Sequence, residues 1–208
     1  MIKTSDNDES RQKVQVNKQS VSYIPIIAKR NKGAPFNSQT IPNRLVQDND
    51  KVFGSNYPKP EITFMHIDNE RILVDKISIK TPFTSRTGAY PMGEGLIFLS
   101  DTLEHFENTD AFGSFTLADY TSWRKLRLKD PRPLRPNEPV AYFQFDASIQ
   151  ITFELDEQRP ARYIMLKPTQ FRQKPNKLSQ NPDLVPMEIQ FFGVIGRTTK
   201  LSQPLECV

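Results

Sequence analysis

The chain has two histidines, and neither lies in a pattern typical of an enzyme. His66 falls within an alternating apolar segment, where an imidazole is more often structural than catalytic. His105 has Glu104, Glu107 and Asp110 nearby, but their spacing matches no recognised set of metal ligands and is typical of a solvated turn. A catalytic nucleophile needs a base beside it, and no motif such as G-x-S-x-G marks a nucleophile in this sequence. The sequence therefore predicts no catalytic residue, no metal site, no cofactor and no enzyme activity.

Positive charge is concentrated in two short stretches of the chain. Residues 124–135 hold six basic residues and one acid, residues 159–177 hold six and none, and together these are 12 of the 28 lysines and arginines. If the fold brings both stretches together, they would form a cationic face suited to acidic peptides, phosphates or nucleic acid. Two ordinary solvated loops are the alternative. Aromatic residues do not interleave with these charges, which disfavours stacking of RNA bases.

Asp48 and Asp50 place two carboxylates close together, where they could serve acid–base chemistry or bind calcium through hard oxygen ligands. No further acid follows them at a recognised spacing. An ordinary turn is therefore the preferred interpretation of this pair.

The composition indicates strands that are separated by rigid turns. The 208 residues include 17 prolines against 8 glycines, together with 14 phenylalanines and 6 tyrosines. Proline interrupts helices and ladders but suits turns and strand ends. Cys207 is the single cysteine, which excludes an intramolecular disulfide. Without a secretory or membrane-spanning segment, we expect a cytoplasmic or nuclear protein with no membrane partner. The net charge of +4 is compatible with nucleic acid, with acidic peptides and with simple solubility.

Six segments have the apolar pattern of β-strands: residues 61–67, 72–80, 95–101, 148–156, 161–168 and 187–194. The second needs a bulge or a change of face near Asp75, and the third fits a strand buried on both faces. Thr116 and Asp119 have capping-box spacing, which predicts a helix that ends before Pro131. A shorter helical turn is expected over residues 102–106.

These elements predict one domain with two tails. Residues 1–20 are polar and are expected to form a disordered tail. Residues 21–200 are expected to form a single β-sandwich domain, with a helical insertion at about 103–139. Residues 201–208 complete the chain as a C-terminal tail.

The order of the segments resembles galactose-binding-like domains of the discoidin and DOC type over residues 45–195. In those domains an acidic turn and an aromatic-Ser-Asn/Asp-x-x-x-Pro loop precede two strands, and here Phe53, Ser55, Asn56 and Pro60 match the loop. Residues 95–101, 161–168 and 187–194 match later strands in the same order. The cysteine pair of secreted discoidin domains is missing, which moves the resemblance toward the intracellular DOC-like domains of ubiquitin ligases.

The resemblance implies an all-β fold, an antiparallel jelly-roll β-sandwich with one or two short helices in an insertion. It also implies a non-catalytic recognition module that binds a protein or peptide partner, including an acidic one, within an intracellular assembly such as a ubiquitin ligase. The binding residues expected at one rim of the sandwich are Asn56, Tyr57, Arg86, Tyr90, Arg172, Lys174 and Lys177.

Two alternatives are left open at this point. One is a carbohydrate-binding domain, in which Asp48 and Asp50 would hold calcium. The other is nucleic-acid binding through the cationic stretches 124–135 and 159–177, which is disfavoured but not excluded.

Overall fold

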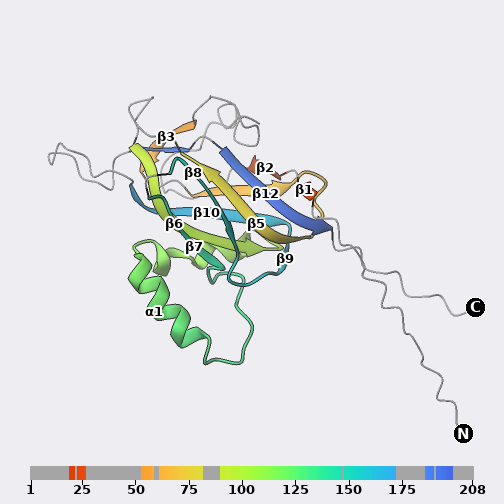
Figure 1. The fold of residues 1–208 in the computed structure, drawn as a ribbon. Coiled ribbons are helices and arrows are strands. Elements are labelled where there is room, and N and C mark those ends of the chain that lie inside the picture. The colour runs from red at the N-terminus through yellow and green to blue at the C-terminus, as the bar shows by residue number, and fades with distance from the viewer. Residues whose placement is uncertain are drawn as a thin grey trace, which may run out of the picture.

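The computed structural model describes residues 19–21, 23–26, 53–58, 61–81, 90–146, 148–171, 186–189 and 191–198. Two β-sheets lie face to face, and a helical segment flanks one of them (Figure 1). The first sheet has the order β1 (Gln19–Val21), β12 (Phe191–Thr198), β5 (Ile72–Lys80) and β8 (Gln150–Glu154), with β9 (Pro160–Ala161) also beside β5.

The second sheet has the order β2 (Tyr23–Ile26), β4 (Ile62–His66), β10 (Tyr163–Phe171), β6 (Tyr90–Ser100), β11 (Pro186–Ile189) and β3 (Phe53–Pro58), with β7 (Ala141–Gln144) also beside β6. Its pairs are antiparallel except for β11 and β6, which run parallel. The predicted all-β antiparallel sandwich is thus confirmed.

The main core lies between the two sheets. Phe64 of β4 stacks on Phe192 of β12, with ring centroids 3.8 Å apart and an interplanar angle of 9°. Ile77 of β5 and Ile97 of β6 are completely buried in the same cluster. These contacts remove large apolar surfaces of both sheets from water, which is the main stabilisation of a sandwich.

A second, smaller core lies on the outer face of the seven-stranded sheet. Three short elements cover that face: η2 (Glu104–Asn108), η3 (Asp110–Phe112) and α1 (Leu117–Arg127). Leu96 and Phe98 of β6 pack there with Phe106 and Tyr120, whereas Ile97 lies in the core between the sheets. Strand β6 is therefore buried on both faces, as its continuous apolar run predicts.

The helix begins where the sequence predicts. The Thr116 hydroxyl accepts a hydrogen bond from the Asp119 backbone N–H at 3.2 Å, and the Asp119 carboxylate accepts one from the Thr116 N–H at 3.0 Å. This reciprocal capping box satisfies donors that the first helical turn leaves free. Helix α1 ends at Arg127, before Pro131, which confirms the expected end.

The expected irregularity near Asp75 is a bulge in β5. Val74 lies opposite Gly196 and Lys76 lies opposite Ile195, so Asp75 is the extra residue of the bulge. Both Val74 and Asp75 are buried, which produces the change of face. The Arg197 guanidinium donates to the Asp75 carboxylate at 2.9 Å and compensates its buried charge.

Three sequence-based expectations need correction. Residues 187–194 belong to two strands in different sheets, because β11 ends at Ile189 in one sheet and β12 begins at Phe191 in the other. Residues 53–58 form strand β3 and not a loop; β3 is the last strand of its sheet, where a proline such as Pro58 is tolerated. The strand expected at residues 95–101 begins earlier, at Tyr90, and ends at Ser100.

The boundary of the N-terminal tail also differs from the expectation. Gln19 and Ser20 belong to β1, where they lie opposite Gly196 and Ile195 of β12. Backbone pairing needs no apolar side chain, which explains why a polar segment can form this short strand. Residues 1–18 of the predicted N-terminal tail and the whole predicted C-terminal tail, residues 201–208, lie outside the described residues.

Candidate ligand-binding site

The sandwich brings three of the predicted binding residues to one part of one sheet. Asn56 and Tyr57 lie in β3, Tyr90 is the first residue of β6, and β11 runs between these two strands. The other predicted binding residues and the acidic pair lie outside the described residues: Arg86, Arg172, Lys174, Lys177, Asp48 and Asp50.

The strand register places these three residues around Met187 of β11. Met187 lies opposite Tyr90 on one side. On the other side Pro186 pairs with Pro58 and Glu188 pairs with Gly54, so residues 55–57 fall opposite Met187 at the bulge. Neighbouring strands are about 4.8 Å apart, which puts β3 about 10 Å from β6 across β11. This is the width of a small ligand.

In the described part of the two basic stretches, several basic side chains hold the fold together and do not contribute to a cationic face. Arg127 is about 10% exposed and donates to the carbonyl oxygens of Arg132 and Pro133, both at 2.6 Å, and to Glu138 at 3.2 Å. It therefore fixes the proline-rich segment that follows α1.

Arg159 has the same structural role from the second stretch. Its guanidinium donates to the carbonyl oxygens of Leu99 at 2.6 Å, Arg135 at 3.0 Å and Leu134 at 3.1 Å. Burial lowers the pKa of Arg159, and nearby carboxylates, beginning with Glu157, partly offset this effect. The side chain thus joins β6 to the proline-rich segment and is not free to bind a ligand.

Lys167 lies in the interior of β10 and not on a cationic surface. Its side chain is 7% exposed and forms an ion pair with Glu61, which is itself 11% exposed. Thr109 and Asp110 of the helical insertion lie 3.4 and 3.8 Å from the Lys167 ammonium. This lysine therefore ties the helical insertion to the sheet.

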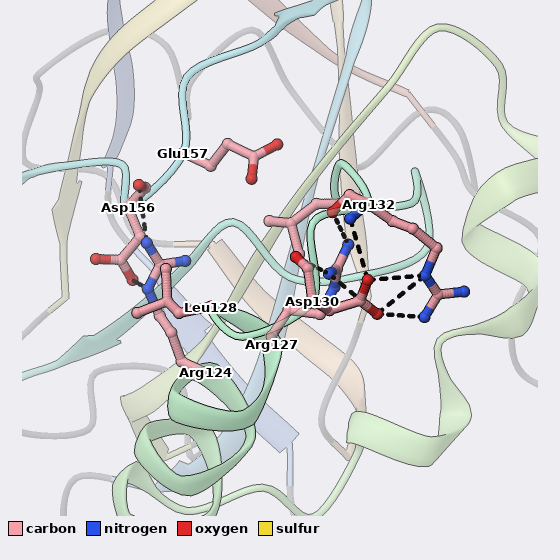
Figure 2. Close-up of a pocket in the computed structure, with 8 residues that line it drawn as sticks. Arg124, Arg127, Leu128, Asp130, Arg132, Asp156 and Glu157 are labelled. Atoms are coloured by element: carbon pink, nitrogen blue, oxygen red, sulfur yellow. Dashed lines mark hydrogen bonds and ion pairs between the residues drawn. The ribbon is translucent and has the colours of Figure 1, made fainter.

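A pocket of about 210 Å³ opens where the end of α1 meets the segment after β8 (Figure 2). Arg124 binds Asp156 on one wall and Arg132 binds Asp130 on the other, so these charges are paired within the pocket. The lining residues are Arg124, Arg127, Leu128, Asp130, Arg132, Leu134, Asp156 and Glu157. Asp156 and Glu157 were not expected here, because two acids after a strand are indistinguishable from a turn in the sequence.

Ionisation in the pocket follows from these pairs. The hydrogen bond from Arg132 holds the pKa of Asp130 well below its usual range, so this carboxylate stays charged at neutral pH. Burial, reinforced by the 2.6 Å hydrogen bond to Asp156, raises the pKa of Tyr120. Tyr120 therefore remains protonated and acts as a fixed donor to Asp156.

The two histidines have structural partners. His66 is buried, and its Nδ1 accepts a hydrogen bond from the Glu70 N–H at 3.3 Å. His105 Nδ1 lies 2.8 Å from the Ser100 hydroxyl. Within the described ranges, no group of three or more His, Cys, Asp or Glu side chains is arranged to hold a metal ion. None of the helices in the described part of the chain is long and apolar enough to cross a membrane.

Several solved structures are similar to this chain at low sequence identity. A fucolectin from striped bass (Morone saxatilis) serum is 14% identical, with a TM-score of 0.41 over 73% of this chain and 38% of that chain. A putative chitobiase fragment from Bacteroides thetaiotaomicron is 10% identical, with a TM-score of 0.47 over 91% of this chain and 98% of that chain. The family 32 carbohydrate-binding module of C. perfringens NanJ, solved in complex with galactose, is 9% identical, with a TM-score of 0.46 over 86% and 99%.

The chain spans little more than a third of the fucolectin chain. No protein-family model matches the sequence, and the search of curated proteins found no match. The narrower assignment to DOC-like domains of ubiquitin ligases stays a prediction.

Proposed function

We propose that the chain is a recognition module that binds a carbohydrate where β3, β11 and β6 lie side by side. The observation that supports this proposal is the register around Met187, which gathers Asn56, Tyr57 and Tyr90 from strands far apart in the sequence. The three residues belong to types that suit a sugar. A tyrosine ring can cover the apolar face of a pyranose, and amide and phenol groups can exchange hydrogen bonds with its hydroxyls.

A glycan array probed with the full chain tests this proposal. We expect a restricted set of glycans to bind, and binding to fall in Tyr57→Ala and in Tyr90→Ala. Tyr163→Ala is the matched control, because Tyr163 packs against the core beneath the helical insertion and lies away from β11. Absence of binding to every glycan, or equal binding by all three variants, would contradict the proposal. Repeating the array with and without calcium tests the predicted role of Asp48 and Asp50.

A protein or peptide partner is the second candidate function. The observation that favours it lies elsewhere in the molecule, at the C-terminal end of α1, where leucines and lysines face solvent together. Membership of a ubiquitin ligase is the most specific form of this candidate and follows from the sequence resemblance alone. Both functions can coexist, because α1 and β3 lie on different sides of the sandwich (Figure 1).

A further inference from the structure

Two leucines at the end of α1 are the most exposed large apolar side chains in the described part of the chain. Leu126 is 68% exposed and Leu128 is 73% exposed. Leu128 is the C-cap residue and keeps helical backbone angles, with φ −63° and ψ −18°. A partner that covers these side chains removes apolar surface from water, which favours binding here.

The helical geometry puts a lysine between these leucines. At about 100° per residue, Leu128, Lys125 and Leu126 follow one another around the helix in this order. Lys129 comes directly after the C-cap in a turn, where its N–H donates to the Leu126 carbonyl oxygen at 3.1 Å. The side that points the other way carries Tyr120, which is buried against the sheet. We call the four outward residues the α1-end surface: Lys125, Leu126, Leu128 and Lys129.

The charge of this surface is not compensated locally. Lys125 and Lys129 are exposed, and no ion pair of either side chain is found in the described structure. Residues 124–135 contain six basic residues, and their single acid, Asp130, is already bound by Arg132. An approaching acidic group therefore finds free cations beside exposed apolar surface.

Helix stability accounts for only part of this arrangement. Cations in the last turn interact favourably with the helix dipole, which explains Lys125 without any partner. The dipole gives no reason for two leucines that face water next to it. A partner segment that combines acidic and apolar side chains matches both halves of the surface.

We propose that the α1-end surface docks an acidic segment of a partner protein that also carries leucine-like side chains. Its carboxylates pair with Lys125 and Lys129, and its apolar side chains cover Leu126 and Leu128. Leu128 also lines the 210 Å³ pocket, so a side chain of the partner can enter beside it. This site is separate from the proposed carbohydrate site and does not depend on it.

Selection of short random peptides displayed on phage, against the full chain, tests the chemistry of the partner. We expect enrichment of peptides in which Asp or Glu alternates with Leu, Ile or Phe. Fluorescence anisotropy of an enriched peptide should then show binding that weakens as salt increases. Lys125→Gln/Lys129→Gln and Leu126→Ser/Leu128→Ser should each weaken binding by about tenfold, the equivalent of about 1.4 kcal/mol.

Matched controls come from positions outside α1. Ile67→Ser changes an apolar side chain that is 53% exposed, and Lys76→Gln/Lys80→Gln removes two charges from β5. Both controls should bind the peptide like the unchanged chain. No enrichment of acidic peptides, equal loss in the controls, or a preference for duplex oligonucleotides over the peptide would overturn the proposal. Glycan binding measured on the same variants should not change, which separates this proposal from the carbohydrate site.

Discussion

At the scale of single residues, the basic side chains divide into those that hold the fold and those that face solvent. Arg127, Arg159 and Lys167 bind carbonyl or carboxylate oxygens in partly or largely buried positions. Lys125 and Lys129 are exposed. Charge density along the sequence cannot separate the two groups, because both occur in the same stretches.

We predict that Arg159→Leu lowers the free energy of unfolding by about 3 kcal/mol, because carbonyl oxygens of residues 99, 134 and 135 lose their shared donor. Denaturation with urea measures the change. Arg135→Ala is the control, since the Arg135 side chain is exposed, and its effect should stay within about 0.5 kcal/mol. Equal effects of the two substitutions would show that Arg159 does not hold the proline-rich segment.

We predict that Lys167→Met lowers the free energy of unfolding by about 3–5 kcal/mol, because it leaves the Glu61 carboxylate buried without its cation. The double variant Lys167→Met/Glu61→Leu should recover part of this loss, since no unpaired charge then remains. Equilibrium unfolding of the wild type, both single variants and the double variant gives the coupling energy. Additive effects of the two substitutions would rule out a coupled pair.

At the scale of elements, close packing limits one glycine of β6. A Cβ atom on Gly95 would lie 2.5 Å from the Lys167 carbonyl oxygen and 2.7 Å from Cζ of Phe143. We predict that Gly95→Ala destabilises the protein by about 1–3 kcal/mol, as overpacking does. Gly113→Ala is the control, because its nearest contact is 3.3 Å. A thermal melt in which both variants behave alike would contradict the close approach of β6, β7 and β10.

The capping box makes a second prediction at this scale. Thr116→Ala should cost about 1 kcal/mol, whereas Thr121→Ala on the exposed side of the same helix should cost less.

Hydrogen bonds from the Thr116 N–H and hydroxyl lower the pKa of Asp119. Its stabilising contribution is therefore complete above the usual carboxyl pKa and is lost as the pH falls through the lowered value. Circular dichroism melts of Asp119→Asn and the wild type should differ at neutral pH and converge in strong acid.

Local patterns predicted the elements whose causes are local. The alternation of residues 72–80 indicated both the strand and its bulge at Asp75, and Thr116 and Asp119 indicated the start of α1. The division of residues 187–194 between two sheets depends on partners distant in sequence, and the alternation looks the same on both sides of the crossing. The pocket at Asp156 depends likewise on the packing of α1 beside the segment after β8.

For the candidate site, the sequence resemblance selected Asn56, Tyr57 and Tyr90, which the strand register places around Met187. The sequence pattern places Met187 only in the expected strand at residues 187–194. Strand β11 runs parallel to β6 and antiparallel to β3, and nothing in residues 186–189 indicates these two pairings. The residues of a site that lies across neighbouring strands can therefore be grouped only when the strand order is known.

At the scale of the whole molecule, two cores of unequal size share strands β6 and β10. Buried side chains from both sheets fill the larger core, which includes the Phe64 and Phe192 stack. The smaller core has five buried residues and joins the helical insertion to the outer face of one sheet. Elements held by fewer buried contacts open at lower free energy, so the insertion should open before the sandwich unfolds.

Hydrogen exchange can show whether the helical insertion opens independently of the sandwich. We predict that amides of α1 exchange at a lower free energy of opening than those of β6 and β10. Phe106→Ala should increase exchange in α1 and alter the emission of Trp123, the single tryptophan, which packs against buried residues of both cores. Phe192→Ala removes a ring from the larger core and should lower protection throughout, by about 3–5 kcal/mol. If Phe106→Ala lowered protection equally in α1 and both sheets, the insertion and the sandwich would form one cooperative unit, and a partner docked on α1 would stabilise the sandwich as well.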